Sequence, residues 1–494
     1  MKRNLSTLLL LAVLLSMYSC GQSTAVETEI NDTASETDAI VEETQKQHDL
    51  PEDLDFGGES VRFLYREEII DEFYATELTG EVVNDETLQA FLDTEETLNI
   101  KVEVTQLPGH YVPVRNSYMN AIKDSVIAGD DVWDWCDAMF GYYPDMAVNG
   151  TFRDISQLEY MDFSKPYYLD GLMDVADLNG KLYFLGGDVS LGYLKNIYCL
   201  VYNLNLASKL GITEDIGQLA LDGGWTAEKL NTLVEMAYAD LDGDGEVDTD
   251  DQLGYYERNI LHRQAYMYGY GSQMIQKVDD TYQFTFGQEL DVSVIETVHK
   301  LIFQTTGAMY SGINDQGENY QTTANGFLAG NILFMTAELR EVEALRDMED
   351  DFLVLPIPKF NEAQEQYIAS SRNTHSAFGM PVTCGNPEMA GAAMECLSAE
   401  RYEAVVPAYY DQTMKVKNAR DPKATAILDM IRESTRMDLG YTYNSIIGNP
   451  VDALFNNMVA TPDKFISSIE SSKASRQSKL DNYIAALNEL PEIE

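Results

Sequence analysis

The strongest chemical motif in the sequence is a run of acidic residues with the spacing of a twelve-residue calcium loop. Its expected oxygen ligands are the side chains or carbonyls of Asp240, Asp242, Asp244, Glu246, Asp248 and Asp251. Calcium is coordinated by several oxygens, and the loop needs a sharp turn, which Gly245 can supply. Asp251 departs from the motif because it replaces a longer glutamate. We expect a weak structural Ca²⁺ site, with a solvated acidic turn as the alternative.

Other catalytic and cofactor motifs are absent from the sequence. The five histidines lie far apart and show no zinc-ligand spacing. There is no phosphate loop, no dinucleotide fingerprint and no serine-hydrolase elbow, so we expect no organic cofactor. Acidic pairs such as Glu67 and Glu68 have the chemistry of glycosidase carboxylates, but a chain with 82 acidic residues produces such pairs by chance.

The first twenty residues predict export and lipid anchoring. Two basic residues are followed by an apolar run at 8–15 that is too short to span a bilayer, and then by Cys20. We expect a signal peptide over residues 1–20 and lipidation of Cys20, which would anchor the protein outside the cytoplasm on a bacterial cell membrane. The alternatives, an ordinary secreted protein and an uncleaved anchor, keep the extracytoplasmic location.

Residues 21–50 have the composition of a disordered acidic tether. They are rich in Thr, Ser and Glu, contain no aromatic residue, and have Lys46 as the sole Lys or Arg. Such a segment cannot bury enough apolar surface to fold. The whole chain has a formal net charge of -49, which argues against nucleic acid as a partner and is consistent with an acidic surface that favours solubility.

Four cysteines follow Cys20, at positions 136, 199, 384 and 396. An even number outside the cytoplasm permits disulfides, but the spacing shows no CxxC pair, and buried free thiols are an equally good interpretation of Cys136, Cys199, Cys384 and Cys396.

Short apolar segments alternate with amphipathic ones from about residue 58, which indicates an α/β fold. Strands are expected at 60–65, 100–106, 132–139, 181–185, 198–202 and 352–355. Helices are expected at 86–98, 118–127, 230–239, 422–437 and 462–487. More than 400 residues of folded chain favour two domains or lobes.

Several blocks in this region resemble the extracellular solute-binding proteins of carbohydrate ABC importers. The blocks are 201–212 (VYNLNLASKLGI), 224–230 (GWTAEKL), 327–335 (FLAGNILFM) and 354–358 (VLPIP). They occur in the order found in that family, and the similarity covers roughly residues 58–490. Within the second block, Trp225 is expected to be structural and Thr226 to cap a helix.

The resemblance implies a two-lobed periplasmic-binding-protein-like fold with a hinge and an interlobe ligand cleft. One lobe would comprise residues 58–185 and 356–435, and the other residues 190–350 and 440–490. Closure of the lobes over a carbohydrate, such as an oligosaccharide, would bury both its apolar faces and its hydroxyls. The expected partners are the transmembrane permease subunits of an ABC importer, and the protein itself would be a monomer without enzymatic activity.

The resemblance also implies a set of ligand-facing positions, which follow strands or lie near the second crossing between the lobes. They are Arg66, Glu67, Phe140, Tyr142, Tyr143, Tyr266, Tyr270, Glu338, Arg340 and Arg372. For the tyrosines, core packing is the alternative; for Arg66 and Glu67, it is simple surface charge.

Two other functions fit the same sequence. A secreted lipoprotein glycosidase or polysaccharide lyase would need a positioned pair of carboxylates, or a basic group beside one. A binding protein for a peptide or another non-sugar solute would keep the fold. Here a cluster of arginines in the cleft would favour an acidic ligand, and carboxylates without arginines a cationic one.

Overall fold

The structure is a computed structural model that describes residues 48–491, except 179, 249, 311–325, 346–347 and 415–421. The predicted signal peptide, Cys20 and most of the predicted tether lie outside the described residues. Within the described part, no helix has both the length and the apolar character needed to span a bilayer.

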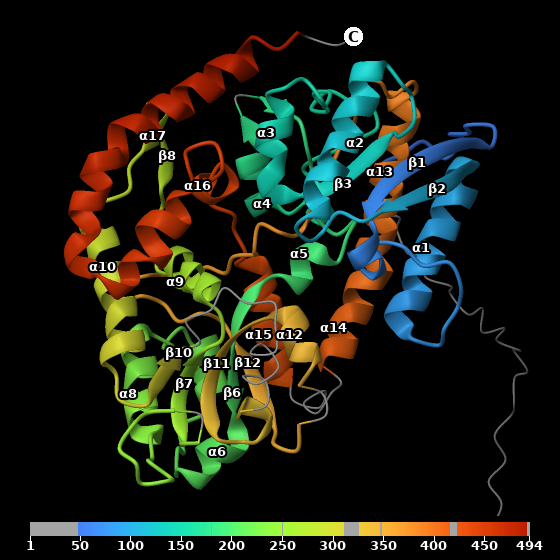
Figure 1. The fold of residues 1–494 in the computed structure, drawn as a ribbon. Helices are drawn as coiled ribbons and strands as arrows, with labels where there is room; N and C mark the ends of the chain where they lie inside the picture. Colours follow the sequence, from blue (N-terminus) through green and yellow to red (C-terminus); the bar gives the residue numbers. More distant parts are fainter. Residues whose placement is uncertain are drawn as a thin grey trace, which may run out of the picture. The chain divides into compact units, whose positions relative to one another are not determined.

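The first sheet has four strands, three of which run parallel to one another (Figure 1). Its strands, in spatial order, are β13 (Ser376–Gly379), β3 (Trp135–Met139), β1 (Glu59–Arg66) and β2 (Ile100–Leu107). β1 runs parallel to β2 and β3, with Phe63 opposite Trp135, whereas β13 is antiparallel to β3. Parallel strands need covering on both faces, and four of the last five side chains before Arg66 in β1 are buried and apolar.

The second sheet has five strands and a mixed order. They are β10 (Ala308–Tyr310), β7 (Leu253–Glu257), β11 (Ile332–Glu338), β6 (Tyr198–Asn203) and β12 (Phe352–Leu355). β7 is parallel to both β10 and β11, while β6 is antiparallel to β11 and β12. Every residue of β6, β7, β11 and β12 is buried. Two short hairpins, β4–β5 (Asp177–Leu178, Lys181–Leu182) and β8–β9 (Ile275–Val278, Thr281–Phe284), lie outside these sheets.

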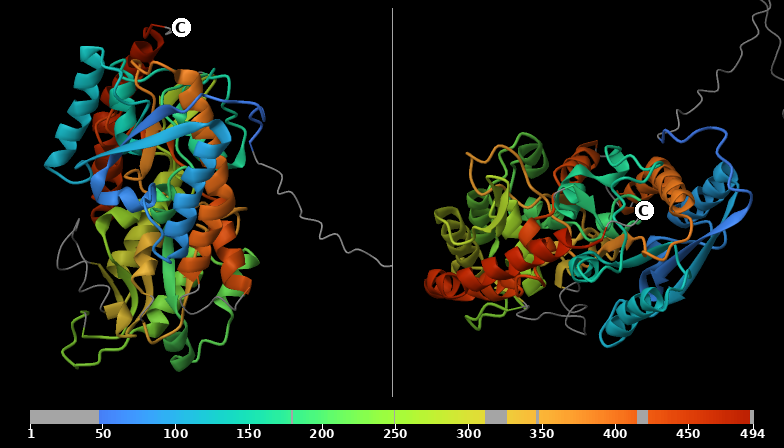
Figure 2. Two further views of the ribbon diagram at one scale, coloured as in Figure 1. Left: turned by 90° about the vertical axis from the view of Figure 1, so that its right-hand side faces the viewer. Right: turned by 90° about the horizontal axis from the view of Figure 1, so that it is seen from above.

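Helices cover both sheets. They are α1 (Val82–Leu98), α2 (Val114–Ala128), α3 (Tyr143–Ala147), α4 (Asp170–Ala176), α5 (Gly192–Lys195), α6 (Leu204–Lys209), α7 (Ile216–Leu221), α8 (Ala227–Ala237), α9 (Arg263–Gly269), α10 (Glu289–His299), α12 (Leu339–Glu343), α13 (Pro387–Glu400), α14 (Val406–Met414), α15 (Pro422–Glu433), α16 (Leu439–Thr442) and α17 (Phe465–Asn488). α1 and α13 lie side by side on the first sheet (Figure 2). α6, α7, α8 and α15 pack on the second sheet.

Three segments cross between the two sheets and pair with one another. Ile197 pairs with Ser371, and Ala369 pairs with Thr435. Backbone hydrogen bonds run from the Tyr198 N–H to the Ser370 carbonyl and from the Arg372 N–H to the Asn196 carbonyl, at 3.0 and 2.9 Å. This paired set of crossings is the arrangement expected of a hinge.

Gly187, in the first crossing, occupies a position that admits no side chain. Its φ is +136°, and a Cβ there would lie 2.1 Å from the Tyr167 carbonyl oxygen. The glycine therefore allows the first crossing to pass directly against the 166–168 turn.

Most of the expected elements appear, with shifted ends. β1, β2, β6 and β12 match their expected ranges within one residue, whereas β3 begins at Trp135 and β5 keeps only two residues. The expected helix at 422–437 ends at Glu433, because residues 434–436 pair with Ala369 of the second crossing. α15 packs against β12 and α7, so it covers the second sheet although the resemblance placed it in the first lobe.

The Gly-Trp-Thr block at 224–226 has the structural role expected from the sequence. The Trp225 side chain is fully buried, and its Nε1–H donates to the Pro356 carbonyl at 3.0 Å. Thr226 is the N-cap of α8, where its hydroxyl accepts from the Lys229 N–H. Cys136, Cys199, Cys384 and Cys396 are all buried, and none of these four described residues forms a disulfide.

Candidate functional site

Polar side chains from both sheets meet where strands end. Arg66 ends β1, His110 follows β2, and Glu338 ends β11. Carboxyl ends of parallel strands share one edge of a sheet, and ligands of open α/β proteins bind outside that edge. The side chains at this edge are therefore the candidate site.

Arg66 is a buried, ion-paired residue of this edge. Its Nε and Nη2 contact the two carboxylate oxygens of Asp137 at 2.7 and 3.1 Å, and Nη2 also donates to the Ser376 hydroxyl at 2.9 Å. Burial alone would lower the pKa of Arg66, but Asp137 raises it above its usual value. Arg66 Nη1 lies 3.1 Å from His110 Nδ1, so only this nitrogen of the guanidinium is directed away from Asp137 toward the loop after β2.

The two glutamates after Arg66 differ in their contacts. Glu67 is exposed. The Glu68 carboxylate accepts from the N–H groups of Gly109 and His110 at 2.9 and 3.1 Å. Partial burial would raise the pKa of Glu68, but these N–H groups and Arg66 lower it. Glu68, which the sequence interpretation did not select, holds the loop that carries His110.

The loop after β3 places its three predicted aromatic residues very differently. Phe140 is fully buried between Phe184 and His375, with ring centroids at 5.3 and 4.8 Å. Tyr143 is also fully buried, and its hydroxyl lies within hydrogen-bond distance of the carbonyls of Cys136 and Ala377.

Tyr142 is only half-buried. Its hydroxyl accepts from Arg115 Nη1 at 2.9 Å, and the Arg115 guanidinium lies 5.4 Å from its ring centroid. Among the three predicted residues of this loop, Tyr142 is thus the one with surface to offer a ligand.

The predicted tyrosines of the second sheet's lobe belong to its core. Tyr266 is fully buried and donates its hydroxyl to the Tyr255 hydroxyl at 2.9 Å. Tyr270 is 3% exposed and packs on Phe360. Every residue of α9 is buried, so the alternation of tyrosines at 266–270 reflects packing on all sides of a short helix.

Glu338 joins the second sheet to the second crossing segment. Its carboxylate is fully buried and contacts Arg340 at 2.6 Å and Arg372 at 3.1 Å. Burial would raise the pKa of Glu338, but the two guanidiniums lower it well below its usual range. Glu338 is therefore an anion, and the side chains of Arg340 and Arg372 remain 29% and 16% exposed.

The charges of four arginines act on the His110 imidazole, and we call them the interlobe arginine cluster: Arg66, Arg115, Arg340 and Arg372. Burial lowers the pKa of His110 most, and together with the charges of these four arginines it brings that pKa to about 3. Arg115 also donates from Nε and Nη2 to the His110 carbonyl at 3.2 and 2.7 Å. His110 is therefore neutral at physiological pH.

Sequence reasoning missed His110 and Arg115 although a signal was available. Both follow β2 at the same sheet edge at which Arg66 ends β1, and ligands of open α/β proteins bind outside that edge. The contact between Arg115 and Tyr142 spans 27 positions in sequence and is not readable from local pattern.

A cavity of about 220 Å³ is lined by residues of both lobes. Its lining includes Asp71 after β1, Lys195 of α5 and Glu343 of α12. Glu72 is buried and directly follows Asp71, which lines the cavity. Burial raises the pKa of Glu72 to about 7 against the opposing charges of Lys195, Arg66 and Arg340. None of the ten predicted ligand contacts lines this cavity.

Comparison with known proteins identifies the fold. No protein-family model and no curated protein matches the sequence. Solved structures do match: the sugar-binding protein MalE from Xanthomonas citri has a TM-score of 0.58 at 12% identity, with 87% of this chain and 100% of that chain covered. The fold is that of ABC substrate-binding proteins.

Two further matches agree. An ABC substrate-binding protein from Listeria monocytogenes in complex with cycloalternan has a TM-score of 0.54 at 13% identity, with 86% and 99% of the two chains covered. The galacto-N-biose/lacto-N-biose I-binding protein of the Bifidobacterium longum ABC transporter, in complex with lacto-N-biose, has a TM-score of 0.57 at 13% identity, with 88% and 98% covered. The two-lobed α/β fold implied by the sequence blocks is thus confirmed.

Three groups of side chains on this substrate-binding-protein fold have the chemistry of metal ligands, and the first is the predicted calcium loop. Carboxylate oxygens of Asp240, Asp242 and Asp244 lie within 4.8 Å of one another. The Asp244 N–H donates to the Asp242 carboxylate and by itself would lower the pKa of Asp242. Slight burial and the neighbouring carboxylates of Asp244, Asp248 and Asp240 nevertheless raise that pKa. A cation would relieve this repulsion.

The last loop position differs from the motif. Asp251 is 1% exposed, and its carboxylate accepts from the Leu241 N–H at 2.9 Å and from the Tyr238 hydroxyl at 3.2 Å. These contacts tie the end of the loop to its beginning. They also engage both Asp251 oxygens, whereas the exposed Asp242 and Asp244 each accept only one backbone N–H among the described hydrogen bonds and keep an oxygen for an ion.

The second group, His262, Glu338 and Glu341, is fully buried. Glu338 is paired with Arg340 and Arg372, and Glu341 lies 3.5 Å from Arg258. Three guanidiniums already neutralise the two carboxylates, so this group does not fit a metal dication.

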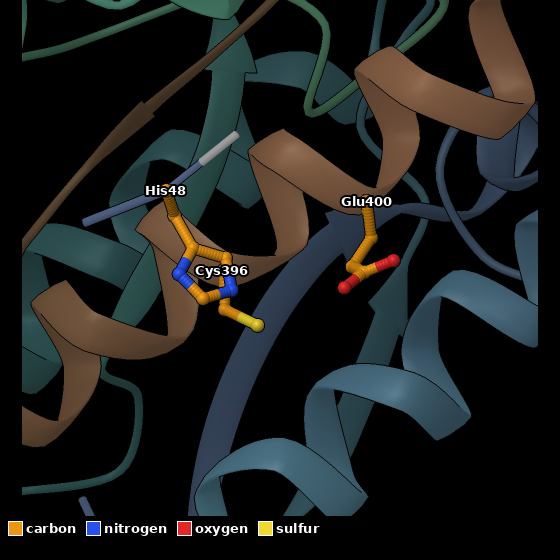
Figure 3. A group of neighbouring side chains, drawn as sticks. All are labelled: His48, Cys396 and Glu400. Atoms are coloured by element: carbon orange, nitrogen blue, oxygen red, sulfur yellow. The ribbon is translucent and has the colours of Figure 1, made fainter. Parts of the chain in front are cut away.

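The third group, His48, Cys396 and Glu400, lies on the face of α13 (Figure 3). Cys396 and Glu400 are one turn apart, and the His48 imidazole faces the thiol. Sulfur, nitrogen and oxygen donors are a zinc-type set. However, the Leu50 N–H donates to His48 Nδ1 at 3.3 Å, so the neutral ring carries its proton on Nε2. A protonated Nε2 does not ligate a metal, and this group fits an internal polar contact better than an ion site.

Proposed function

We propose that this chain is the substrate-binding lipoprotein of an ABC importer, and that it captures a carbohydrate outside the cytoplasm and delivers it to permease subunits. The observation that carries the proposal is the meeting of polar side chains from both sheets, in a fold shared with solved sugar-binding proteins. Guanidiniums and hydroxyls match the rim of sugar hydroxyls, and the half-buried Tyr142 ring matches an apolar sugar face.

Capture would occur by closure of the two lobes about the paired crossing segments. We propose lobe boundaries of 58–185 with 356–435, and 190–350 with 440–490. The packing of α15 on β12 favours moving residues 422–433 into the second lobe. In the closed form, Glu338 and Arg372 would hold the second sheet to the crossing segments.

The remaining assignments rest on sequence. Cys20 would carry the lipid anchor, residues 21–50 would form the tether, and the protein would act as a monomer that performs no reaction. The enzyme alternative is not favoured by Glu338, because a glycosidase needs a neutral carboxylic acid, and Arg340 and Arg372 keep Glu338 ionised.

The acidic loop at 240–251 would hold a structural Ca²⁺. The mutual repulsion of Asp240, Asp242 and Asp244 supports this assignment. Added Ca²⁺ should raise the melting temperature of the wild type, because a ligand that binds only the folded state stabilises it by mass action. Asp244→Asn should abolish that rise. An identical melting temperature in Ca²⁺ and in chelator would exclude the site.

The function is tested by calorimetric titration of residues 46–494, which form one compact unit, with neutral and acidic mono- and oligosaccharides. Saturable binding, with the sugar recovered unchanged, is the expected result. Consumption of the sugar would support the glycosidase or lyase alternative. Absence of binding to every sugar would support a peptide or another non-sugar solute.

A further inference from the structure

Helix α1 carries two buried threonines whose hydroxyls differ in their partners. Thr94 is 0% exposed, and its hydroxyl donates to the Ala90 carbonyl at 2.8 Å. A bond to the carbonyl four residues earlier is a common way for a helical threonine to satisfy its hydroxyl. Thr87 is 1% exposed, and its hydroxyl has no hydrogen-bond partner among the described residues. Because buried hydroxyls are nearly always hydrogen-bonded, this one calls for a partner that the described chain does not supply.

Thr87 lines the cavity of about 220 Å³ that has walls from both lobes. A hydroxyl can donate one hydrogen bond and accept two, so it can serve either kind of group in an occupant of this cavity. No member of the interlobe arginine cluster is among the described residues that line it. The cavity therefore has a different set of lining residues from the strand-end edge at which Arg66 and Tyr142 lie.

An ion pair on the cavity wall joins the two lobes. Lys195 Nζ lies 3.2 Å from Asp71 Oδ2. Asp71 lies in the turn after β1, in the first lobe, whereas Lys195 belongs to α5, which packs against α12 of the second lobe. An ammonium has three N–H donors, and a carboxylate has two acceptor oxygens. The described hydrogen bonds of the two side chains use one N–H and one oxygen, so both keep capacity for a ligand.

Aromatic and aliphatic side chains complete much of the wall. They are Tyr74, Tyr409, Ala75 and Val83. Tyr74 is half-buried, and its ring packs edge-on against Phe91 with the centroids 4.9 Å apart. Aromatic and apolar surface with a few placed polar groups matches a sugar ring, which has apolar C–H faces and a rim of hydroxyls that both donate and accept.

The size of the cavity limits the occupant. Pockets for drug-sized ligands have about 300 to 1,000 Å³, so a volume of about 220 Å³ suits one sugar ring and not a chain of rings. A wholly apolar occupant does not fit, because it would leave the Thr87 hydroxyl buried and unpaired.

We propose that this cavity is a second binding site, additional to the strand-end edge, and that it holds one neutral sugar ring. Thr87 is its specificity-determining residue and shares hydrogen bonds with a ring hydroxyl. Asp71 and Lys195, whose charges offset each other, bind neighbouring hydroxyls from the two lobes. The choice of a sugar as occupant rests on the proposed function, and the site itself goes beyond it.

The test is titration calorimetry on residues 46–494, which form one compact unit. The probes are four neutral monosaccharides, namely glucose, galactose, mannose and xylose, with glycerol as the control for any small polyol. At least one monosaccharide should bind, and glycerol should bind at least about tenfold more weakly, because it has no ring to contact the aromatic wall.

Thr87→Val should weaken binding of that monosaccharide about tenfold, because it keeps a similar shape and removes the hydroxyl. Its melting temperature should stay equal to that of the wild type or rise, since an unpaired buried hydroxyl is replaced by an apolar group. Thr87→Ser keeps the hydroxyl and should retain the affinity.

Thr94→Val is the matched control on the same helix. It removes a hydroxyl that is bonded within the protein and does not line the cavity, so it should lower the melting temperature and leave the affinity unchanged.

The outcomes separate this site from the proposed function. Unchanged monosaccharide affinity in Thr87→Val, or glycerol binding as tight as that of the sugar, would overturn the inference. Loss of monosaccharide affinity in Tyr142→Ala but not in Thr87→Val would place the ring at the strand-end edge instead. Binding of oligosaccharides alone would exclude the second site and leave the proposed function intact. Failure of every mono- and oligosaccharide to bind would overturn the proposed function and the sugar site together.

Discussion

Two buried glutamates, one in each lobe, have pKa values shifted in opposite directions, although the charge of Arg340 lowers the pKa of both. Glu72 is 5% exposed and Glu338 is fully buried, and Arg340 acts on both. Burial raises the pKa of Glu72 to about 7, whereas the pKa of Glu338 is lowered well below its usual range. The difference is direct contact: Glu338 touches two guanidiniums at 2.6 and 3.1 Å, while the cations around Glu72 make no such ion pair among the described contacts.

The comparison shows that two direct guanidinium contacts outweigh burial at Glu338. One contact is not enough at Asp188, where Arg432 lies at 2.7 Å and burial still raises the pKa to about 6. A buried acid without such contacts favours its neutral form and makes folding depend on pH.

The substitution expected to lower stability most is Asp137→Ala. Asp137 and Arg66 are the most enclosed ion pair of the site, at 0% and 1% exposed. Removing the acid leaves a buried guanidinium uncompensated, which should lower the free energy of unfolding by about 3 to 5 kcal/mol. Denaturant unfolding measures this loss.

The exposed Asp130 provides the control for that variant. Asp130→Ala should change the free energy of unfolding by less than about 0.5 kcal/mol. A loss of similar size in both variants would mean that the Arg66–Asp137 pair has no special role.

Glu72→Gln tests the opposite case. The pKa of Glu72 is about 7 in the folded protein and about 4.3 in an unfolded chain, so the folded state binds more protons between these values. The stability that Glu72 contributes is complete below about pH 4.3 and is lost as the pH rises to 7. Relative to the wild type, Glu72→Gln should therefore gain on the order of 3 kcal/mol between pH 4 and pH 8.

The measurement is the free energy of unfolding across this pH range. Glu77→Gln is the control because Glu77 is exposed in the same loop region. Parallel curves for the wild type and Glu72→Gln would show that Glu72 is ionised in the folded state throughout.

Glu338→Gln should change the pH dependence of the free energy of unfolding in the opposite direction to Glu72→Gln, and by a smaller amount. Because the folded pKa of Glu338 is lowered, its stabilisation is present above the unfolded pKa of about 4.3 and is lost as the pH falls below it. At pH 7 the variant should lose about 1.5 to 3 kcal/mol, the contribution of hydrogen bonds to a charged group. That deficit should shrink between pH 4.3 and pH 3. A deficit that stays constant with pH would mean that Glu338 is not an ion in the folded protein.

Tyr142→Ala should have the smallest effect on folding and act on binding. Its ring is half-buried, whereas Tyr143 beside it is fully buried. Affinity for the sugar identified by calorimetry should fall about tenfold, and the melting temperature should change little. Tyr143→Phe, which removes only an internal hydroxyl, is the contrasting variant: it should lower stability and leave affinity unchanged. The reverse pattern would exchange the roles of the two tyrosines.

The sequence predicted local structure well where a few neighbouring residues decide it. The strand at β1 follows from its apolar and β-branched run, and the cap at Thr226 follows from a hydroxyl before a helical pattern. The resemblance added the two-lobed fold, which the comparison with solved structures confirms.

Prediction of the site was less complete because an aromatic residue near a glycine has the same local sequence pattern whether it packs in a core or lines a cleft. Tyr143, Tyr266 and Tyr270 share this local pattern with Tyr142, yet the first three are buried. Arg115 was missed because its contact with Tyr142, which follows β3, spans 27 positions in the sequence.

The sequence by itself therefore determined the order of strands and helices, the acidic loop at 240–251 and the strongly negative charge. Only the tertiary structure decided which charges compensate one another. Asp137 meets Arg66 across 71 positions, and Arg372 meets Glu338 across 34. Secondary structure depends on residues a few positions apart, whereas the charge state of a buried group depends on whichever cation the fold brings within about 3 Å of it.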